Sequence, residues 1–344
     1  MNITDMWDPV VNKPDGMTTH KFKTALKRNI SYIHAPSLGP PKGNVIFGTG
    51  YGDSYLFHYE TIKRFQEMGY TVWAFDWSGQ GLSERYNTPD PDIVEDNSIP
   101  NHIMDLKDFT NKVVRQDNSD PVIYASHSMG GHIGMHVLKQ SPKLFDSAVF
   151  ITPLLDLDTH LAPRKTIKTL TQWGIRLGLK NKQIPSLENT FRKLTGQAAN
   201  DNAGQYTSSR NNMRSLTLEY LRNQTPEAAV KLPTYGWLSN IFMSAEQMHK
   251  QNWFQTIQTP VLFITAGRDG IVDNTPTFKA AKEMPNATHR HYHIAEHAIF
   301  SASDDLYNSM WQTVDSYLSA LNANSHFEKK RGEKKDFCPK CPNL

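Results

Sequence analysis

The fold class of this chain is decided by the stretch Val122-Ile-Tyr-Ala-Ser126-His-Ser128-Met-Gly130-Gly131. An apolar run that is typical of a buried strand leads directly into a helical pattern, with Ser128 at the junction. A sharp strand-to-helix turn raises a serine hydroxyl above the end of a sheet, next to backbone N–H groups. The turn is strained and needs small residues on both sides. Ser126 and Gly130 meet this need, although glycine is more usual at the position of Ser126.

The chain on both sides of this turn alternates short β-rich runs with helical patterns. Such alternation is typical of an α/β fold, in which helices cover a mainly parallel sheet. Helices are expected over residues 59–68, 129–139 and 306–321. Strands are expected at residues 29–34, 44–47, 71–75, 121–125, 147–151, 260–265 and 290–293.

A long interruption separates the fifth of these predicted strands from the sixth. Residues 153–259 carry no strand signal, and a chain of 344 residues exceeds the usual size of a single core. Because the interruption lies between two buried strands, we expect a helical lid that leaves the edge of the sheet and returns to it. The predicted core is therefore residues 1–152 and 260–322, and a basic, disordered tail is expected at residues 323–344.

Charge and composition narrow the class of protein. The net charge of +3 is too small to indicate a nucleic-acid-binding protein, and residues 328–344 hold the whole excess. No apolar run approaches the roughly 18 residues that a membrane-spanning helix needs. The first residues lack the apolar segment of a signal peptide, so a cytoplasmic location is expected. Cys338 and Cys341 form at most half of a zinc site, which favours a solvated tail over a metal site.

A serine hydroxyl is a weak nucleophile at neutral pH and needs a base, which an acid in turn orients. On a sheet of this kind the acid, and then the base, follow the serine along the chain. Asp269 directly follows a predicted buried strand, and His297 lies after the next strand and before the last helix. Both should emerge at the strand ends where Ser128 emerges. We therefore predict a catalytic triad of Ser128, Asp269 and His297.

Other residues compete for these roles. His291 and His293 alternate in a way that resembles metal-ligand spacing, although two side chains on one sheet face explain the alternation more simply. Next to the nucleophile, His127 faces the wrong way for a base, and His132 is expected on the helix surface. Three further aspartates could supply the acid: Asp273, Asp156 and Asp158.

Acyl transfer also needs N–H donors aimed at the oxyanion that develops in the transition state. One predicted donor is the N–H of Met129, the residue after the nucleophile. The other should come from the glycine-rich loop at residues 48–52, and we assign it to Tyr51, with a neighbouring residue as the alternative. No Gly-Lys-Ser/Thr follows these glycines, so a phosphate-binding loop is not indicated.

Several sequence blocks together carry a family resemblance: Gly50-Tyr-Gly-Asp-Ser54, Asp76-Trp-Ser-Gly-Gln-Gly-Leu-Ser83, Ser126-His-Ser-Met-Gly-Gly131, Ala295-Glu-His297, Gln205-Tyr-Thr-Ser-Ser-Arg210 and Pro233-Thr-Tyr-Gly-Trp237. Over residues 28–322 the chain resembles the lysophospholipase and monoacylglycerol lipase branch of the α/β-hydrolases. Thr49-Gly50 stands where monoacylglycerol lipases often have histidine–glycine, which favours the bacterial lysophospholipases. The resemblance implies an eight-stranded, mostly parallel sheet with helices on both faces, and ester hydrolysis of single-chain lipids without a cofactor.

The expected lid contains a basic amphipathic segment. Residues 159–187 include six basic residues and no acidic one. Ile167, Leu170, Trp173 and Leu177 fall on one helical face, largely opposite the cations. Such a helix suits an anionic membrane surface, but the same stripe could instead pack over the active site. Peripheral contact with the inner face of the membrane, through the lid or the basic tail, is therefore one expectation.

The function that these features predict is a serine carboxylic-ester hydrolase acting on a single-chain lipid ester through an acyl-enzyme, in the first place a lysophospholipase. A monoacylglycerol lipase, or a general carboxylesterase or peptidase of the same fold, is the alternative. An acyl acceptor other than water would make the protein a transacylase. Two other classes are a non-catalytic lipid-binding relative and a metal-dependent hydrolase that uses His291, His293 and an aspartate.

Overall fold

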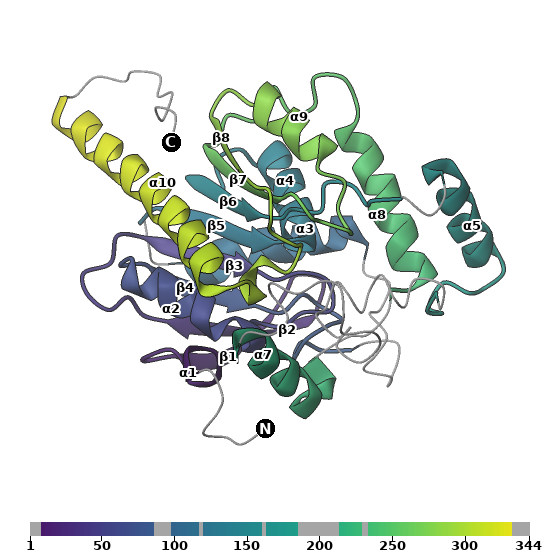
Figure 1. Cartoon of the computed structure of the whole chain (residues 1–344), viewed down its shortest axis with the longest axis horizontal. Coiled ribbons are helices and arrows are strands. Elements are labelled where there is room, and N and C mark those ends of the chain that lie inside the picture. The colour runs from purple at the N-terminus through teal and green to yellow at the C-terminus, as the bar shows by residue number, and fades with distance from the viewer. Residues whose placement is uncertain are drawn as a thin grey trace.

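The computed structural model describes residues 8–85, 98–116, 120–159, 163–184, 213–228 and 233–331. Its strands are β1 (Thr18–Lys23), β2 (Asn29–Ala35), β3 (Asn44–Gly48), β4 (Thr71–Phe75), β5 (Val122–His127), β6 (Ser147–Ile151), β7 (Val261–Ala266) and β8 (Ala287–Tyr292). They form one sheet in the order β1-β2-β4-β3-β5-β6-β7-β8 (Figure 1). β2 runs antiparallel to β1 and β4, and the other neighbouring pairs are parallel. The predicted α/β class and the mostly parallel, eight-stranded sheet are confirmed.

The α-helices are α1 (Asp8–Val11), α2 (Tyr59–Glu67), α3 (Ile99–Phe109), α4 (Met129–Gln140), α5 (Arg164–Arg176), α7 (Met213–Gln224), α8 (Tyr235–Met248), α9 (Thr275–Glu283) and α10 (Asp304–Arg331). α3, α4 and α8 bury apolar side chains against one face of the sheet, and α2 and α10 against the other. On β5, Tyr124 belongs to the first core and Ile123 to the second, as expected for a strand buried on both sides. Helices therefore cover both faces (Figure 1), and α10 continues past residue 322 to Arg331.

β1 is the strand that the sequence pattern did not reveal. Five of its six residues are exposed, and it lies at the edge of the sheet, where it pairs only with β2. A strand with almost no buried side chain shows no apolar alternation, which is the signal that sequence patterns carry. The sequence Thr-Thr-His-Lys-Phe-Lys is accordingly mostly polar.

The described part of residues 153–259 contains α5, α7, α8 and a short 3-10 turn at Pro226–Ala228, but no named strand. The described helices include none that is long and apolar enough to cross a membrane. Two features singled out in the sequence, the segment at residues 205–210 and the cysteine pair of the tail, lie outside the described residues.

His132 is completely buried, so the prediction of a surface position for it is wrong. Its Nδ1 lies 2.8 Å from the carbonyl oxygen of Leu154, and its Nε2 lies 2.6 Å from Oγ of Ser244 on α8. The same hydroxyl lies 2.8 Å from Nε2 of His136. Burial lowers the pKa of His132 to about 3 and that of His136 to about 4, so both rings are neutral at pH 7. The reason for the error is that α8, far along the chain, covers α4.

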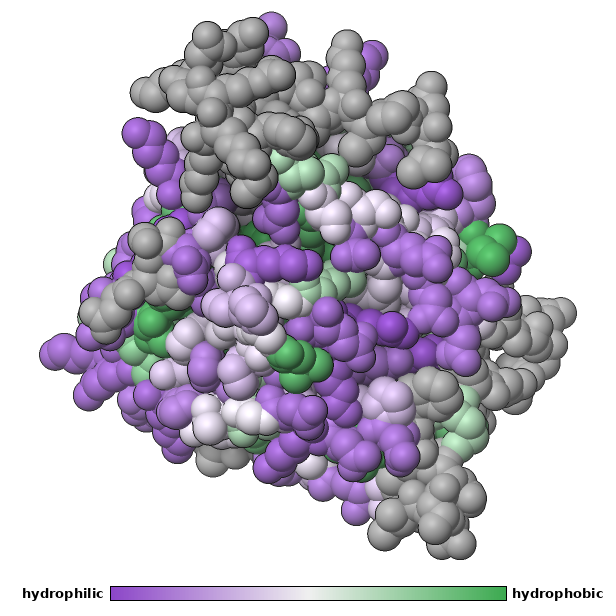
Figure 2. Space-filling view, turned by 90° about the vertical axis from the view of Figure 1, so that its left-hand side faces the viewer, coloured by the Kyte–Doolittle hydropathy of each residue, from purple (hydrophilic) through white to green (hydrophobic). Residues whose placement is uncertain are grey.

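Three of the four residues of the apolar stripe of α5 are exposed, while Ile167 is partly buried against the hydrophobic core. α5 contacts α8 through its buried residues Thr171 and Gly174, and a Cβ on Gly174 would lie 2.5 Å from the ring of Tyr235. The side chains that point away from this contact remain in solvent, with exposed fractions of 62% for Leu170, 56% for Trp173 and 71% for Leu177. Figure 2 views the molecule from the side of α10, away from α5, where the surface is mainly hydrophilic and apolar residues are scattered.

Candidate active site

Ser128 occupies the turn between β5 and α4 with φ 50° and ψ −114°, a backbone conformation that residues other than glycine rarely adopt. The neighbouring glycines are required by close contacts. A Cβ on Gly130 would lie 2.5 Å from the carbonyl oxygen of Gly48, and a Cβ on Gly131 would lie 2.6 Å from Cβ of Pro153. The strained turn therefore depends on small residues after the serine, as the sequence pattern predicted.

The structure brings Ser128, His297 and Asp269 together. Nε2 of His297 lies 3.0 Å from Oγ of Ser128, and its Nδ1 lies 2.8 Å from Oδ2 of Asp269. Oδ1 of Asp269 accepts the N–H groups of Ile271 and Val272 at 3.0 and 2.9 Å, which fixes the orientation of a fully buried carboxylate. A hydroxyl, an imidazole and a carboxylate in this order form the geometry of a serine nucleophile with its base and acid.

The competing aspartates make their described contacts elsewhere. Asp156 bonds His249 at 2.8 Å through Oδ2 and forms an ion pair with Arg164. The carboxylate of Asp273 accepts the N–H of Thr275 at 2.8 Å, and the backbone N–H of Asp158 donates to the carbonyl of Ile271. Of the four candidate aspartates, the structure places Asp269 against His297. The described contacts of the other three lie elsewhere.

The alternating histidines of β8 contact a threonine. Nδ1 of His291 and Nε2 of His289 each lie 2.8 Å from Oγ1 of Thr265 on the neighbouring strand. His293 follows β8, and its ring lies 4.6 Å from that of His291. Within the described residues no group of three or more His, Cys, Asp or Glu side chains could hold a metal ion.

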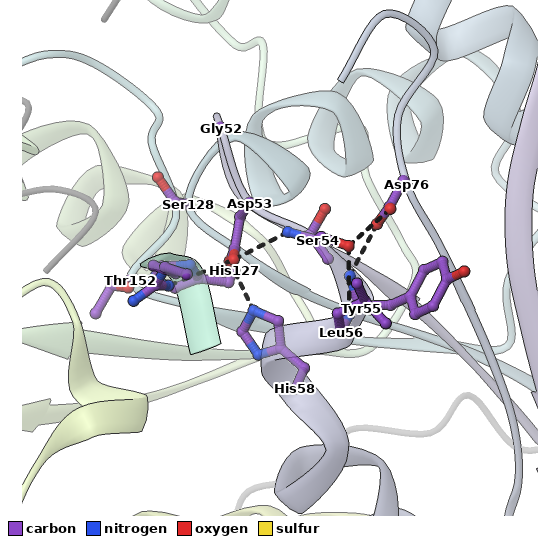
Figure 3. Close-up of polar contacts among 12 residues, drawn as sticks. Gly52, Asp53, Ser54, Tyr55, Leu56, His58, Asp76, His127, Ser128 and Thr152 are labelled. Carbon is purple, nitrogen blue, oxygen red and sulfur yellow. Dashed lines mark hydrogen bonds and ion pairs between the residues drawn. The ribbon is translucent and has the colours of Figure 1, made fainter. Parts of the chain in front are cut away.

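Two residues that the sequence did not single out for this purpose hold the backbone of His297. Oγ1 of Thr152 donates to the carbonyl oxygen of His297 at 3.1 Å, and Nε2 of His127 lies 3.2 Å from the same oxygen. Burial, with the nearby His297, lowers the pKa of His127 to about 3, so the neutral ring donates through Nε2–H. Thr152 has a φ of 43°, and no local sequence signal marks such a position. His127, Thr152 and Ser128 lie side by side in Figure 3.

The loop at residues 48–52 lies directly against the nucleophile. A Cβ on Gly50 would be 3.4 Å from Cβ of Ser128. The ring of Tyr51 packs on Trp237 at 4.1 Å, and Nε1 of Trp237 donates to Sδ of Met129 at 3.3 Å. Met129 is the first residue of α4, so its N–H has no acceptor within the helix. Both predicted oxyanion donors, Tyr51 and Met129, therefore lie in segments that adjoin Ser128.

Asp76 connects this loop to the segment after β4. Its carboxylate accepts hydrogen bonds from Oγ of Ser54 at 2.7 Å and from the N–H of Tyr55 at 2.8 Å (Figure 3). It also accepts the N–H of Leu82 at 2.7 Å. Burial raises the pKa of Asp76 to about 7, although these donors act in the opposite direction. The shared block that begins at Asp76 thus has a physical role, which is to hold two loops together beneath the site.

A pocket opens beside Ser128, with polar and charged residues in its wall. Oδ2 of Asp53 lies 2.6 Å from Nε2 of His58, and Oδ1 lies 3.5 Å from Nη2 of Arg222 on α7. Burial alone would raise the pKa of Asp53, but His58 and Arg222 hold it well below its usual range. Asp53 is therefore a carboxylate at neutral pH, and the pocket combines anionic and cationic groups. Figure 3 shows Asp53 pointing toward His58 and His127.

A mostly parallel sheet with a serine on a strained turn after β5, and with an aspartate and a histidine after β7 and β8, defines an α/β-hydrolase. The comparisons with known proteins give the family. The chain belongs to the serine aminopeptidase S33 family, whose model matches residues 39–304.

Individual relatives agree with this class. The chain is 23% identical over 297 residues to the probable lysophospholipase L2 of Haemophilus influenzae. The matched stretch covers 85% of this chain and 90% of that protein. It is 25% identical over 152 residues to the monoglyceride lipase of Rattus norvegicus, covering 44% and 48% of the two chains.

Solved structures share the fold. A soluble variant of monoglyceride lipase from Saccharomyces cerevisiae superposes with a TM-score of 0.67 at 16% identity, covering 88% of this chain and 95% of that one. A thermostable carboxyl esterase from Bacillus coagulans gives a TM-score of 0.68 at 14% identity, covering 89% and 99%. The protein is accordingly a hydrolase of the lipase and esterase class.

Proposed function

We propose that this protein is a serine carboxylic-ester hydrolase for single-chain lipids, in the first place a lysophospholipase. The observation that carries the proposal is the chain of contacts from Asp269 through His297 to Ser128 at 2.8 and 3.0 Å. The similarity to the lysophospholipase of Haemophilus influenzae, which extends over most of both chains, supports the lipid substrate. The similarity to a monoglyceride lipase supports the runner-up.

In the proposed mechanism His297 takes the proton of Ser128 as the hydroxyl oxygen attacks the ester carbonyl. The N–H groups of Tyr51 and Met129 stabilise the oxyanion of the tetrahedral intermediate. The intermediate then collapses, and His297 transfers its proton to the oxygen of the leaving alcohol. Water, deprotonated by the same histidine, hydrolyses the acyl-enzyme and releases the fatty acid. Asp269 keeps the imidazole in the correct tautomer throughout.

A substrate panel tests the proposed lipid specificity. We expect the value of kcat/KM for a long-chain lysophospholipid to exceed that for p-nitrophenyl acetate, because only the lipid contributes binding energy from its chain and headgroup. The release of fatty acid and of p-nitrophenol measures the two rates. A lysophospholipid rate no higher than the short-ester rate would contradict the lipid assignment, and a clearly faster monoacylglycerol would favour the runner-up.

We further propose that α5 contacts an anionic membrane. Leu170, Trp173 and Leu177 are more than half exposed, and the guanidinium of Arg176 lies 6.0 Å from the centre of the Trp173 ring. Exposed apolar side chains with cations beside them are typical of helices that lie in the membrane interface. This contact would bring the insertion, and with it the pocket, to the lipid surface where the substrates reside.

Replacing Trp173 and Leu177 together by alanine should weaken the binding to anionic vesicles by about 10-fold or more, since burying each such side chain contributes about 1.5–3 kcal/mol. Cosedimentation with phosphatidylglycerol and phosphatidylcholine vesicles measures this effect. Leu38→Ala is the matched control. Leu38 is likewise an exposed leucine, at 57%, but it belongs to the α/β part of the chain and not to the insertion. An equal loss in the control, or unchanged binding in the double variant, would count against this contact.

A further inference from the structure

We propose that the pocket beside Ser128 receives the alcohol part of the ester, and that Arg222 selects substrates whose alcohol carries a phosphate. The inference rests on the proposed ester hydrolysis and names the substrate class within it. It concerns the polar end of the substrate, which the chain of contacts at Ser128 does not specify.

The pocket is built from four parts of the chain. Its volume is about 40 Å³, and its wall includes Ser128, the loop with Asp53, and Ala298 and Ser301 after His297. Arg222 enters this wall from α7, which belongs to the insertion between β6 and β7. The core therefore supplies the reacting serine, and the insertion supplies the cation.

The position of His297 decides which part of an ester the pocket would hold. In acyl transfer the base that activates the serine later gives its proton to the leaving alcohol, so the alcohol must lie on the side of that base. Ala298, Phe300 and Ser301, which follow His297 along the chain, line one side of the pocket. An ester bound at Ser128 thus has its alcohol directed into the pocket.

Arg222 has hydrogen-bonding capacity left for a ligand. Its Nε is buried and has no hydrogen-bond partner among the described residues. The ion pair of Arg222 with Asp53 is long, at 3.5 Å, while Asp53 is already bonded to His58 at 2.6 Å and to the N–H of Ser54 at 3.0 Å. Leaving a buried donor unsatisfied is costly, and the planar guanidinium matches phosphate oxygens with two parallel N–H groups.

His127 offers the complementary group. Because Nε2–H of its neutral ring donates to the carbonyl of His297, Nδ1 carries a lone pair. This Nδ1 is buried without a hydrogen-bond partner in the described part of the chain, and it faces Gly50 in the pocket wall, where a Cβ would lie 3.1 Å away. It could accept a hydrogen bond from a hydroxyl. A donor for phosphate and an acceptor for hydroxyl together fit a glycerophosphate group.

The helix that carries Arg222 is firmly attached to the core. Arg214, at the start of α7, bonds Glu60 at 2.7 and 3.0 Å, Asp304 at 2.8 Å and the carbonyl of Ala302 at 2.8 Å. Its side chain is only 2% exposed. Arg222 itself packs over the ring of Phe57 at 5.0 Å. The guanidinium of Arg222 is therefore held in place before a substrate arrives.

The test compares two substrates that differ only in the phosphate: 1-hexanoyl-glycerol 3-phosphate and 1-monohexanoyl-glycerol, both kept below their micellar concentrations. Arg222→Gln should lower kcat/KM for the phosphate substrate by about 10- to 100-fold, mainly through KM, because a charge-assisted hydrogen bond is lost. The value for monohexanoyl-glycerol should change by less than about 3-fold, because that substrate has no group for the guanidinium. Arg222→Lys should retain part of the preference. Lys23→Gln removes an exposed cation of the edge strand β1 and should leave both substrates unaffected.

Binding of glycerol 3-phosphate to the full chain carrying Ser128→Ala, measured by calorimetry with and without Arg222→Gln, tests the site without catalysis. Binding that depends on Arg222 supports the inference even if neither ester is hydrolysed, in which case the proposed function alone fails. Inorganic phosphate binding as tightly as glycerol 3-phosphate would overturn the assignment to an alcohol group. Equal losses on both esters would make Arg222 merely structural, and no loss on the phosphate ester would also overturn the inference.

Discussion

Replacing Ser128 by alanine should reduce ester hydrolysis by about 10⁴-fold or more, because removal of the nucleophile leaves only the oxyanion donors and substrate binding. Oγ of Ser128 is the atom that lies 3.0 Å from Nε2 of His297. Turnover of p-nitrophenyl butyrate measures the loss, and a fluorophosphonate probe should label the unmodified protein alone.

Ser126→Gly is the matched control for this experiment. Ser126 is buried two residues before the nucleophile, and glycine there restores the more usual pattern around the turn. The control should keep its activity and its labelling. Retention of either property by Ser128→Ala would show that another residue is the nucleophile.

Replacing Asp269 by asparagine should lower kcat by about 10⁴-fold while leaving KM nearly unchanged. The amide keeps the shape of the carboxylate, but it cannot stabilise the imidazolium and it favours the wrong tautomer of His297. Since the N–H groups of Ile271 and Val272 hold the other carboxylate oxygen, the side chain should remain in place. Steady-state kinetics on one soluble ester would separate the two parameters.

Asp273→Asn provides the comparison for that variant. Asp273 lies in the same loop, and its carboxylate accepts the N–H of Thr275, at the start of α9. We expect its kcat to stay within about 3-fold of the unmodified value, because no transition-state contact is removed. If the Asp273 variant loses as much activity as the Asp269 variant, the assignment of the acid is wrong.

The fold class and the candidate triad were accessible from the sequence because both depend on order along the chain. Buried parallel strands are short apolar runs, and their carboxyl ends meet at one edge of the sheet. Ser128, Asp269 and His297 each follow such a run, so their meeting could be expected without coordinates. β1 escaped detection because an exposed edge strand leaves no such pattern.

The features that sequence patterns missed depend on contacts between distant segments. Periodicity shows that α5 has an apolar face, but not whether that face is covered, and the structure leaves Trp173 and Leu177 exposed. The helical pattern predicted a surface position for His132, but α8 covers this residue and contacts it through Ser244. The role of Thr152 also depends on a distant segment, because its hydroxyl donates to the carbonyl oxygen of His297, 145 positions away.

The sequence by itself determined the α/β class, the strained turn at Ser128 and the order of the residues proposed to react with it. These are properties of local patterns and of chain order, which a strand or a turn encodes in neighbouring residues. Only the tertiary structure decided which aspartate reaches His297 and that Arg222 and Asp53 share a pocket with Ser128. Those outcomes depend on distances of a few ångströms between segments far apart in the chain, and the local pattern of residues does not contain these distances.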